Sequence, residues 1–232
     1  MPSLGPTDAP RRDHGAPALP DFATRRTVMV DNQIRPSEVT SFPIIEAMLH
    51  VPREAFVPPA RIEAAYLGEN LFLAPGRVVL DPRTLGKLLE GLDIVPGERV
   101  LDLGTGLGYA AALIARMGAE VVALEDDPAR AAAAGEALRG TGVRVVQGPL
   151  PAGAPAEAPF DAILVEGAVE TMPQAITDQL APDGRIGAIF AEDGVGVARI
   201  GRKEAGRVHW RYAFNAGAPV IPGFERPRAF VL

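Results

Sequence analysis

The sequence predicts an α/β protein built on a Rossmann-like, doubly wound and mostly parallel sheet, with antiparallel C-terminal strands and an N-terminal helical extension. Two observations predict this class. From about residue 96, short apolar segments typical of buried strands alternate with segments typical of helices, which is the pattern of parallel βαβ units. A charged turn at 202–206 then joins two alternating segments, as in a β-hairpin.

Composition divides the 232 residues into three parts. Residues 1–20 are rich in proline, alanine and glycine, and we expect them to form a flexible tail. Residues 21–95 are expected to form a helical extension packed on the core, and residues 96–232 the Rossmann-like domain.

The extension contains several helix signals separated by prolines. We expect helices over about 23–35 and 60–67, and a helix after a cap at Thr40 or Ser41. Residues 51–59 contain three prolines and are expected to form a rigid connector. Asp81 and Pro82 open a further helix, because aspartate is a good N-cap and proline suits the first turn.

The remaining elements follow in order after a turn at Pro96-Gly97. The expected strands are 99–103, 120–124, 143–147, 160–165, 185–190, 196–201 and 208–214. The expected helices are 109–117, 127–139 and 172–180.

The strongest functional signal is the glycine-rich turn after the first core strand. Asp102 stands near the strand end, Gly104, Gly106 and Gly108 permit positive φ and close approach of a ligand, and Glu125 ends the next strand. In a nicotinamide fingerprint the third small residue would stand where this chain has Tyr109. S-adenosylmethionine fits better, because Asp102 can face its ammonium and Glu125 its ribose hydroxyls. A glycine-rich turn without a ligand is the alternative, and Tyr109 is equally suited to packing the helix start.

Composition restricts the other classes of function. The formal net charge is −6 and the pI about 5.2, with no basic cluster, which disfavours a nucleic-acid surface. The chain has no cysteine, and its three histidines lack metal-ligand spacing, so we expect no metal site. No apolar run reaches membrane-spanning length and no signal peptide is evident, so we expect a cytoplasmic protein that does not bind membranes.

The chain resembles the protein-L-isoaspartate O-methyltransferase family from about Arg25 onward. The resemblance rests on a glycine loop shared with many methyltransferases, and on a more specific proline-rich signature. The matching segments are 29–34, 51–58, 100–109, 158–165 and 173–184.

The resemblance implies methyl transfer from S-adenosylmethionine to the α-carboxylate of isoaspartyl residues in damaged proteins, leaving S-adenosylhomocysteine. Together with the glycine-rich turn and the strand ends, the resemblance predicts which residues bind the cofactor. These are Asp102, Gly104, Thr105, Gly106, Gly108, Tyr109, Glu125, Asp126, Gly148, Leu150 and Glu166. Glu166 follows a strand, where a solvated loop acid is an equal alternative.

Two positions depart from the family pattern. The acceptor-site region is Leu80, Asp81, Pro82 and Thr84, and Leu80 stands where the family has a serine hydroxyl. Gly148-Pro149-Leu150 replaces a glycine-acid-glycine sequence at the adenine. We interpret Asp81 as an N-cap rather than a substrate ligand. A methyltransferase with another acceptor, or a non-catalytic binding homologue, therefore remains an alternative to the repair enzyme.

Overall fold

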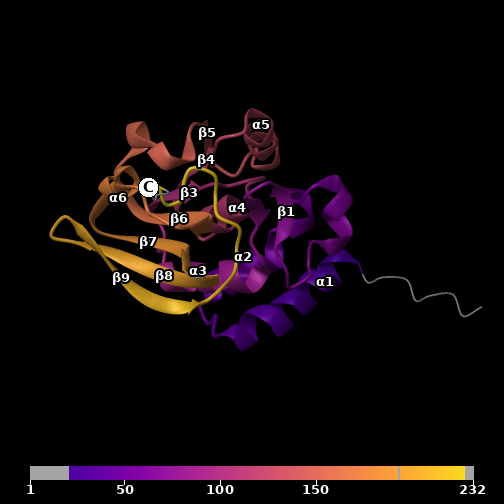
Figure 1. The fold of residues 1–232 in the computed structure, drawn as a ribbon. Coiled ribbons are helices and arrows are strands. Elements are labelled where there is room, and N and C mark those ends of the chain that lie inside the picture. Colours follow the sequence, from indigo (N-terminus) through magenta and orange to yellow (C-terminus); the bar gives the residue numbers. More distant parts are fainter. Residues whose placement is uncertain (1–20, 193, 228–232) are drawn as a thin grey trace, which may run out of the picture.

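The computed structural model describes residues 21–192 and 194–227, so the expected tail at 1–20 lies outside the described residues. Its centre is a seven-stranded sheet with strand order β5-β4-β3-β6-β7-β8-β9 (Figure 1). The strands from β5 to β7 pair in parallel, whereas β8 pairs antiparallel with both β7 and β9. The predicted fold class is confirmed.

The core elements follow the expected order. The strands are β3 (Arg99–Leu103), β4 (Glu120–Glu125), β5 (Arg144–Gln147), β6 (Phe160–Val169), β7 (Leu180–Glu192), β8 (Val195–Glu204) and β9 (Arg207–Asn215). The helices are α4 (Tyr109–Arg116), α5 (Pro128–Ala137) and α6 (Gln174–Asp178). The last of these is shorter than expected, because Leu180 already pairs with Phe160 in the sheet.

The extension is helical, with several irregular turns. It contains α1 (Phe22–Met29), a π-helical turn (Val30–Ile34), α2 (Phe42–His50), 3-10 turns at Arg35–Ser37, Arg53–Phe56 and Pro59–Ala64, and α3 (Pro82–Leu92). The expected side-chain cap of α2 is wrong: the Glu90 carboxylate accepts hydrogen bonds from the backbone N–H groups of Thr40 and Ser41 instead. Asp81 caps α3 as predicted, by accepting from the Thr84 N–H at 2.9 Å.

Two short strands were not anticipated. β1 (Leu71–Ala74) and β2 (Arg77–Val79) form an antiparallel hairpin that turns at Gly76, whose φ is +73°. Four-residue and three-residue strands carry too little alternation to be identified from sequence. This hairpin brings Arg77 against the glycine-rich turn.

Alternate residues of each strand enter two different cores. Val121 and Ala123 of β4 pack with the extension, α3 and α4, whereas Val122 and Leu124 face the side that contains α6. The extension therefore covers one face of the sheet and shares its core, on the right in Figure 1. Among the described residues, no helix combines the length and the apolar character needed to cross a bilayer.

Candidate active site

Three buried carboxylates stand in a row on one face of the sheet. Asp102 of β3 lies opposite Ala123 of β4 and Leu164 of β6, so Glu125 and Glu166 stand two residues farther along their strands. Because side chains alternate with period two, all three carboxylates point to the face covered by the extension. Their side chains are 0–2% exposed. The carboxyl ends of adjacent parallel strands, where α/β proteins bind ligands, thus carry a concentrated negative charge.

The glycine-rich turn closes around this row. Gly104, Gly106 and Gly108 have φ values of +82°, +61° and +96°. The Thr105 hydroxyl donates to Asp102 Oδ2 at 2.6 Å, and the Gly106 N–H donates to Glu125 Oε2 at 2.9 Å. The turn therefore links β3 to the end of β4 while its backbone stays open to close approach.

Asp102 and Glu166 form an electrostatically coupled pair. Burial raises the pKa of Asp102 to about 6, and the charge of Glu125 adds to this, whereas the Thr105 hydroxyl opposes it. Burial and the neighbouring Asp102 hold the pKa of Glu166 well above its usual value. Within the described part of the chain, Asp102 Oδ1 and Glu166 Oε1 have no hydrogen-bond donor, so a proton on one carboxyl can be shared with the other.

Arg77 neutralises the third carboxylate, and this residue was missed by the sequence analysis. Its guanidinium binds both oxygens of Glu125, at 3.0 and 2.7 Å, as well as Asp126 Oδ1 at 2.7 Å and the Gly104 carbonyl at 2.8 Å. Burial lowers the pKa of Arg77, but hydrogen bonding to Glu125 outweighs it and the net pKa is raised. Arg130 of α5 adds a second contact to Glu125 at 2.9 Å.

Arg53 connects the glycine turn to the acceptor-site region. This fully buried side chain donates from Nε to the Ala65 carbonyl and from Nη2 to the Leu80 carbonyl, both at 2.7 Å. Its guanidinium lies 4.8 Å from the centre of the Tyr109 ring. Burial lowers the pKa of Arg53 and raises that of Tyr109 to about 12. Arg53 Nη1 and the Tyr109 hydroxyl have no hydrogen-bond partner among the described residues.

The residues of the acceptor-site region form the first turn of α3 and the segment just before it. Leu80 is fully buried, Thr84 is 2% exposed, and Pro82 occupies the first turn of the helix. Asp81 accepts the Thr84 N–H and its own N–H donates to Asn70 Oδ1 at 2.8 Å. The structural role predicted for Asp81 is therefore the one observed.

The predicted adenine region begins beside Glu125. The Gly148 N–H donates to the backbone carbonyl of Glu125 at 3.0 Å. Leu150 is 1% exposed and packs into the α6-side core. A Cβ on Gly104 would lie 3.8 Å from Leu150 Cδ1, so the Leu150 side chain reaches the glycine turn. The structure thus brings the predicted cofactor residues to one edge of the sheet.

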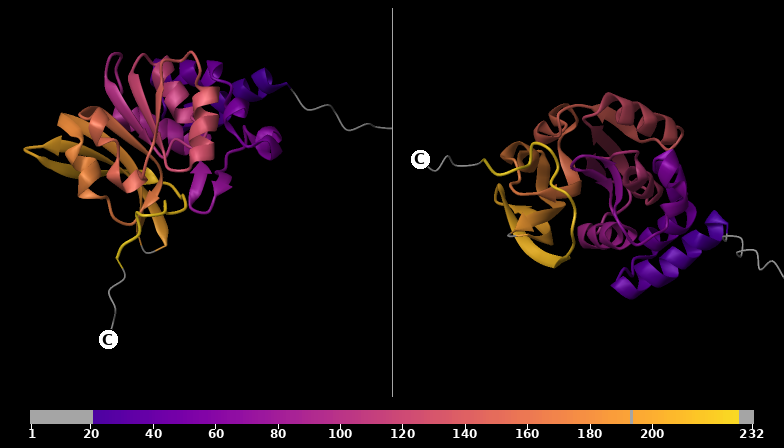
Figure 2. Two further views of the ribbon diagram at one scale, coloured as in Figure 1. Left: turned by 90° about the horizontal axis from the view of Figure 1, so that it is seen from above. Right: turned by 45° about the vertical axis from the view of Figure 1, so that its right-hand side comes forward.

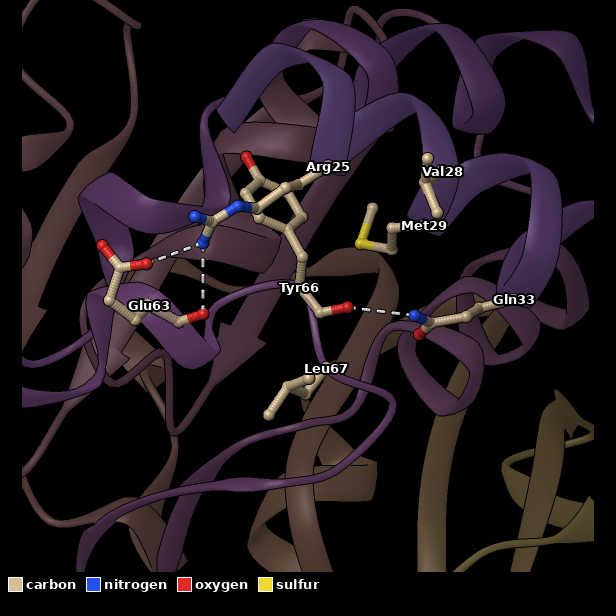
Figure 3. Close-up of a pocket in the computed structure, with 7 residues that line it drawn as sticks. All are labelled: Arg25, Val28, Met29, Gln33, Glu63, Tyr66 and Leu67. Atoms are coloured by element: carbon tan, nitrogen blue, oxygen red, sulfur yellow. Dashed lines mark hydrogen bonds and ion pairs between the residues drawn. The ribbon is translucent and has the colours of Figure 1, made fainter. Parts of the chain in front are cut away.

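A separate apolar pocket of about 290 Å³ lies on the extension (Figure 3). None of the predicted site residues lines this pocket. Its lining consists of Arg25, Val28, Met29, Gln33, Glu63, Tyr66 and Leu67. Its polar groups bind each other, with Arg25 on Glu63 at 2.8 Å and the Gln33 amide donating to the Tyr66 carbonyl at 3.0 Å. This pocket therefore lies apart from the carboxylate row.

The polar groups of the carboxylate row fit S-adenosylmethionine. The unpartnered oxygens of Asp102 and Glu166 suit an ammonium, the glycine turn admits a close ligand, and Glu125 suits a ribose diol. Arg77 stands on the two Glu125 oxygens that the diol would need.

Comparison with known proteins identifies close sequence relatives. The family profile described as Protein-L-isoaspartate(D-aspartate) O-methyltransferase matches residues 24–212. The chain is 43% identical over 174 residues to a protein-L-isoaspartate O-methyltransferase of Methylorubrum extorquens, covering 72% of this chain and 75% of the relative. A relative of the same name from Gloeobacter violaceus is 42% identical over 161 residues, covering 68% and 78%.

Solved structures share the fold. A protein-L-isoaspartate O-methyltransferase structure superposes with a TM-score of 0.74 at 22% identity, covering 88% of this chain and 66% of that chain. A protein-L-isoaspartate O-methyltransferase from Plasmodium falciparum, in complex with S-adenosyl-L-homocysteine, gives 0.73 at 19% identity, covering 85% and 97%. The predicted family is confirmed by the sequence relatives and the predicted fold by the structures.

Proposed function

The chain belongs to the protein-L-isoaspartate O-methyltransferase family, and from that premise we propose that it methylates the α-carboxylate of isoaspartyl residues in proteins. The observation that carries the proposal is the 43% identity over 174 residues to a relative of that name. The row of buried carboxylates beside a glycine turn supports it, because a methyltransferase needs a site for a cofactor with a cationic amino-acid end.

S-adenosylmethionine supplies an activated methyl group on a sulfonium. Asp102 and Glu166 would hold its ammonium, because they offer two buried, unpartnered oxygens at the carboxyl ends of β3 and β6. Glu125 would accept the ribose hydroxyls, and the Gly104–Gly108 turn would face the rest of the nucleoside. Such charge pairing would hold the amino-acid end of the cofactor at the carboxyl ends of β3 and β6.

The acceptor needs orientation more than activation. A carboxylate is already ionised at pH 7, so the protein's contribution is to align oxygen, methyl carbon and sulfur and to exclude water. Arg53 supports this role because its two bonds, to the Ala65 and Leu80 carbonyls, tie the segment before α3 to the site. No general base is required for the transfer.

Leu80 favours one second candidate, a methyltransferase with a different acceptor. The side chain is fully buried and has no hydroxyl to hold an incoming carboxylate. A less polar acceptor environment would change which carboxylate binds, while leaving the cofactor side intact.

Transfer of labelled methyl to an isoaspartyl peptide, against the matched aspartyl peptide, separates these candidates. Base-labile label on the isoaspartyl peptide alone is the expected result. Binding of S-adenosylhomocysteine by calorimetry together with no label on either peptide would reject the repair activity and favour the second candidate. No binding at millimolar ligand would reject both.

The substitution Leu80→Ser tests the acceptor region itself. A hydroxyl beside the acceptor carboxylate adds a charge-assisted hydrogen bond, so we expect kcat/KM for the isoaspartyl peptide to rise by about tenfold. Leu80→Ala is the matched control, since it makes the same space without a donor. An equal gain in both variants would show that space, rather than the hydroxyl, limits the reaction.

A further inference from the structure

Every polar atom of the predicted ribose carboxylate is already bound within the chain. Glu125 Oε1 accepts from Arg77, Arg130 and the Asp127 N–H, at 3.0, 2.9 and 3.2 Å. Glu125 Oε2 accepts from Arg77 at 2.7 Å and from the Gly106 N–H at 2.9 Å. A ribose diol that donates to both oxygens must therefore replace at least one of these donors.

Among these donors, Arg77 is the one whose position allows it to move away from Glu125. Arg130 and Asp127 belong to the start of α5, and the Gly106 N–H belongs to the glycine turn, so all three donors come from elements joined to the main sheet. Arg77 comes instead from the two-stranded hairpin β1–β2, which is outside the main sheet. Its guanidinium also binds the Gly104 carbonyl, which places it inside the turn that would face the cofactor.

The hairpin is seated closely on the same turn. A Cβ added to Gly106 would stand 2.8 Å from Leu73 Cδ1, and one added to Gly104 would stand 3.3 Å from Arg77 Nη2. Two of the three glycines of the predicted cofactor loop thus receive hairpin side chains in the space that their missing Cβ atoms leave. The hairpin therefore packs directly on the loop that is predicted to face the cofactor.

A C-terminal segment supports the hairpin from behind. A Cβ on Gly76 would lie 2.7 Å from the Val220 carbonyl and 2.6 Å from Pro222 Cδ, and Asn70 donates to the Gly217 carbonyl at 2.7 Å. The segment is itself tied to β6, because Ile221 and Ala168 are joined by a backbone hydrogen bond at 2.9 Å. Figure 2 shows this yellow segment beside the magenta hairpin in its left view. The match to the family ends at residue 212, before this segment begins.

We propose that Arg77 is a gate residue, an internal ligand of Glu125 that the cofactor must displace before its ribose can bind. The β1–β2 hairpin carries the gate and the segment 216–224 holds it in place. The proposal rests on the proposed function for the identity of the ligand, but not for the methyl acceptor.

An internal competitor has a defined thermodynamic consequence. It reduces the apparent affinity of every ligand that needs the open site, by a factor equal to the fraction of molecules that are open. S-adenosylmethionine and S-adenosylhomocysteine share the same ribose, so both affinities fall by the same factor. Weaker product binding then assists turnover, because the returning guanidinium competes with the spent cofactor.

Calorimetry with S-adenosylhomocysteine tests the gate through Arg77→Gln, with Arg130→Gln as the matched control. Both variants remove one guanidinium from Glu125. Within the described residues, however, Arg130 binds Glu125, Asp126 and Asp127 and makes no bond to the glycine turn. We expect Arg77→Gln to bind S-adenosylhomocysteine at least about tenfold more tightly than the native chain. Arg130→Gln should bind it no more tightly than the native chain. Equal or weaker binding by Arg77→Gln would overturn the proposal.

A second measurement uses the native chain and needs no variant to fold. Dicarbonyl modification of arginine, followed peptide by peptide by mass spectrometry, reports exposure of Arg77, which is 2% exposed here. We expect S-adenosylhomocysteine to speed modification of Arg77 severalfold, with half-exposed Arg116 unchanged as the internal reference. Slower or unchanged modification of Arg77, under conditions where calorimetry detects binding, would overturn the gate. Neither readout involves methyl transfer, so failure of the acceptor assignment would leave both results standing.

Discussion

Replacing Asp102 by asparagine is expected to stabilise the fold near neutral pH while weakening cofactor binding. Burial raises the pKa of Asp102 from its ordinary 3.8 to about 6, so the native state resists ionising this group. A pKa shift of one unit corresponds to about 1.4 kcal/mol, so keeping Asp102 ionised destabilises the native state by about 3 kcal/mol. Asparagine keeps an oxygen that can accept from the Thr105 hydroxyl and carries no charge to bury.

The sign of the effect follows from proton linkage. The native pKa lies above the unfolded one, so between pH 4 and 6 the unfolded chain has released a proton that the native chain still holds. The contribution of Asp102 to the free energy of unfolding of the native sequence therefore falls as pH rises through this window, and levels off above it. Loss of the Asp102 charge also relieves Glu166, whose pKa that charge helps to raise. The substitution therefore stabilises the native state in two ways, by removing the buried charge of Asp102 and by easing ionisation of Glu166.

Urea unfolding of the two chains at half-unit steps from pH 4 to 8 measures this difference. We expect the advantage of Asp102→Asn in unfolding free energy to grow by about 2 kcal/mol between pH 4 and 7. Its affinity for S-adenosylmethionine should fall by at least about tenfold, because the ammonium loses a charged partner. Glu120→Gln, at an exposed position of β4, is the control with no such trend. A difference between the two chains that does not change with pH would refute the reasoning.

Two further substitutions test local structure, each with urea unfolding and calorimetry. Asp81→Ala removes the cap that accepts the Thr84 N–H and should cost about 1 kcal/mol of stability, with unchanged affinity for S-adenosylhomocysteine; a large loss of affinity would instead assign Asp81 to the ligand site. Gly108→Ala places a Cβ 2.7 Å from Leu138 Cδ1 at a φ of +96°, and should cost about 2 kcal/mol or more; stability equal to the native chain would contradict the requirement for glycine there.

The carboxylate row was predictable because it depends on local patterns. Asp102 and Glu125 follow from two apolar strands with a glycine turn between them, and parallel pairing brings strand ends to one edge. Glu166 was identified by the same rule, although its burial at 2% excludes the alternative of a solvated loop acid. Alternation along the strands then places all three on one face.

The two fully buried arginines near this row, Arg53 and Arg77, were not predictable from the same patterns. Arg53 lies in a short 3-10 turn and Arg77 in a three-residue strand, and neither element has a period that sequence reasoning can detect. A charge argument offers the missing signal, since buried carboxylates require cations or protons. That argument predicts that some arginine must come to the row, but it leaves its position in the sequence open.

The site therefore contains residues from both sides of residue 95, the predicted boundary between the extension and the Rossmann-like domain. The core supplies the negative charge, the extension supplies Arg53 and Arg77, and the segment beyond the family match supports the hairpin that carries Arg77. In the proposed gate, cofactor binding is a competition between the Arg77 guanidinium and the ribose hydroxyls for Glu125, rather than the filling of a preformed glycine loop. Changes in the hairpin or the C-terminal segment would tune that competition without altering any residue of the loop.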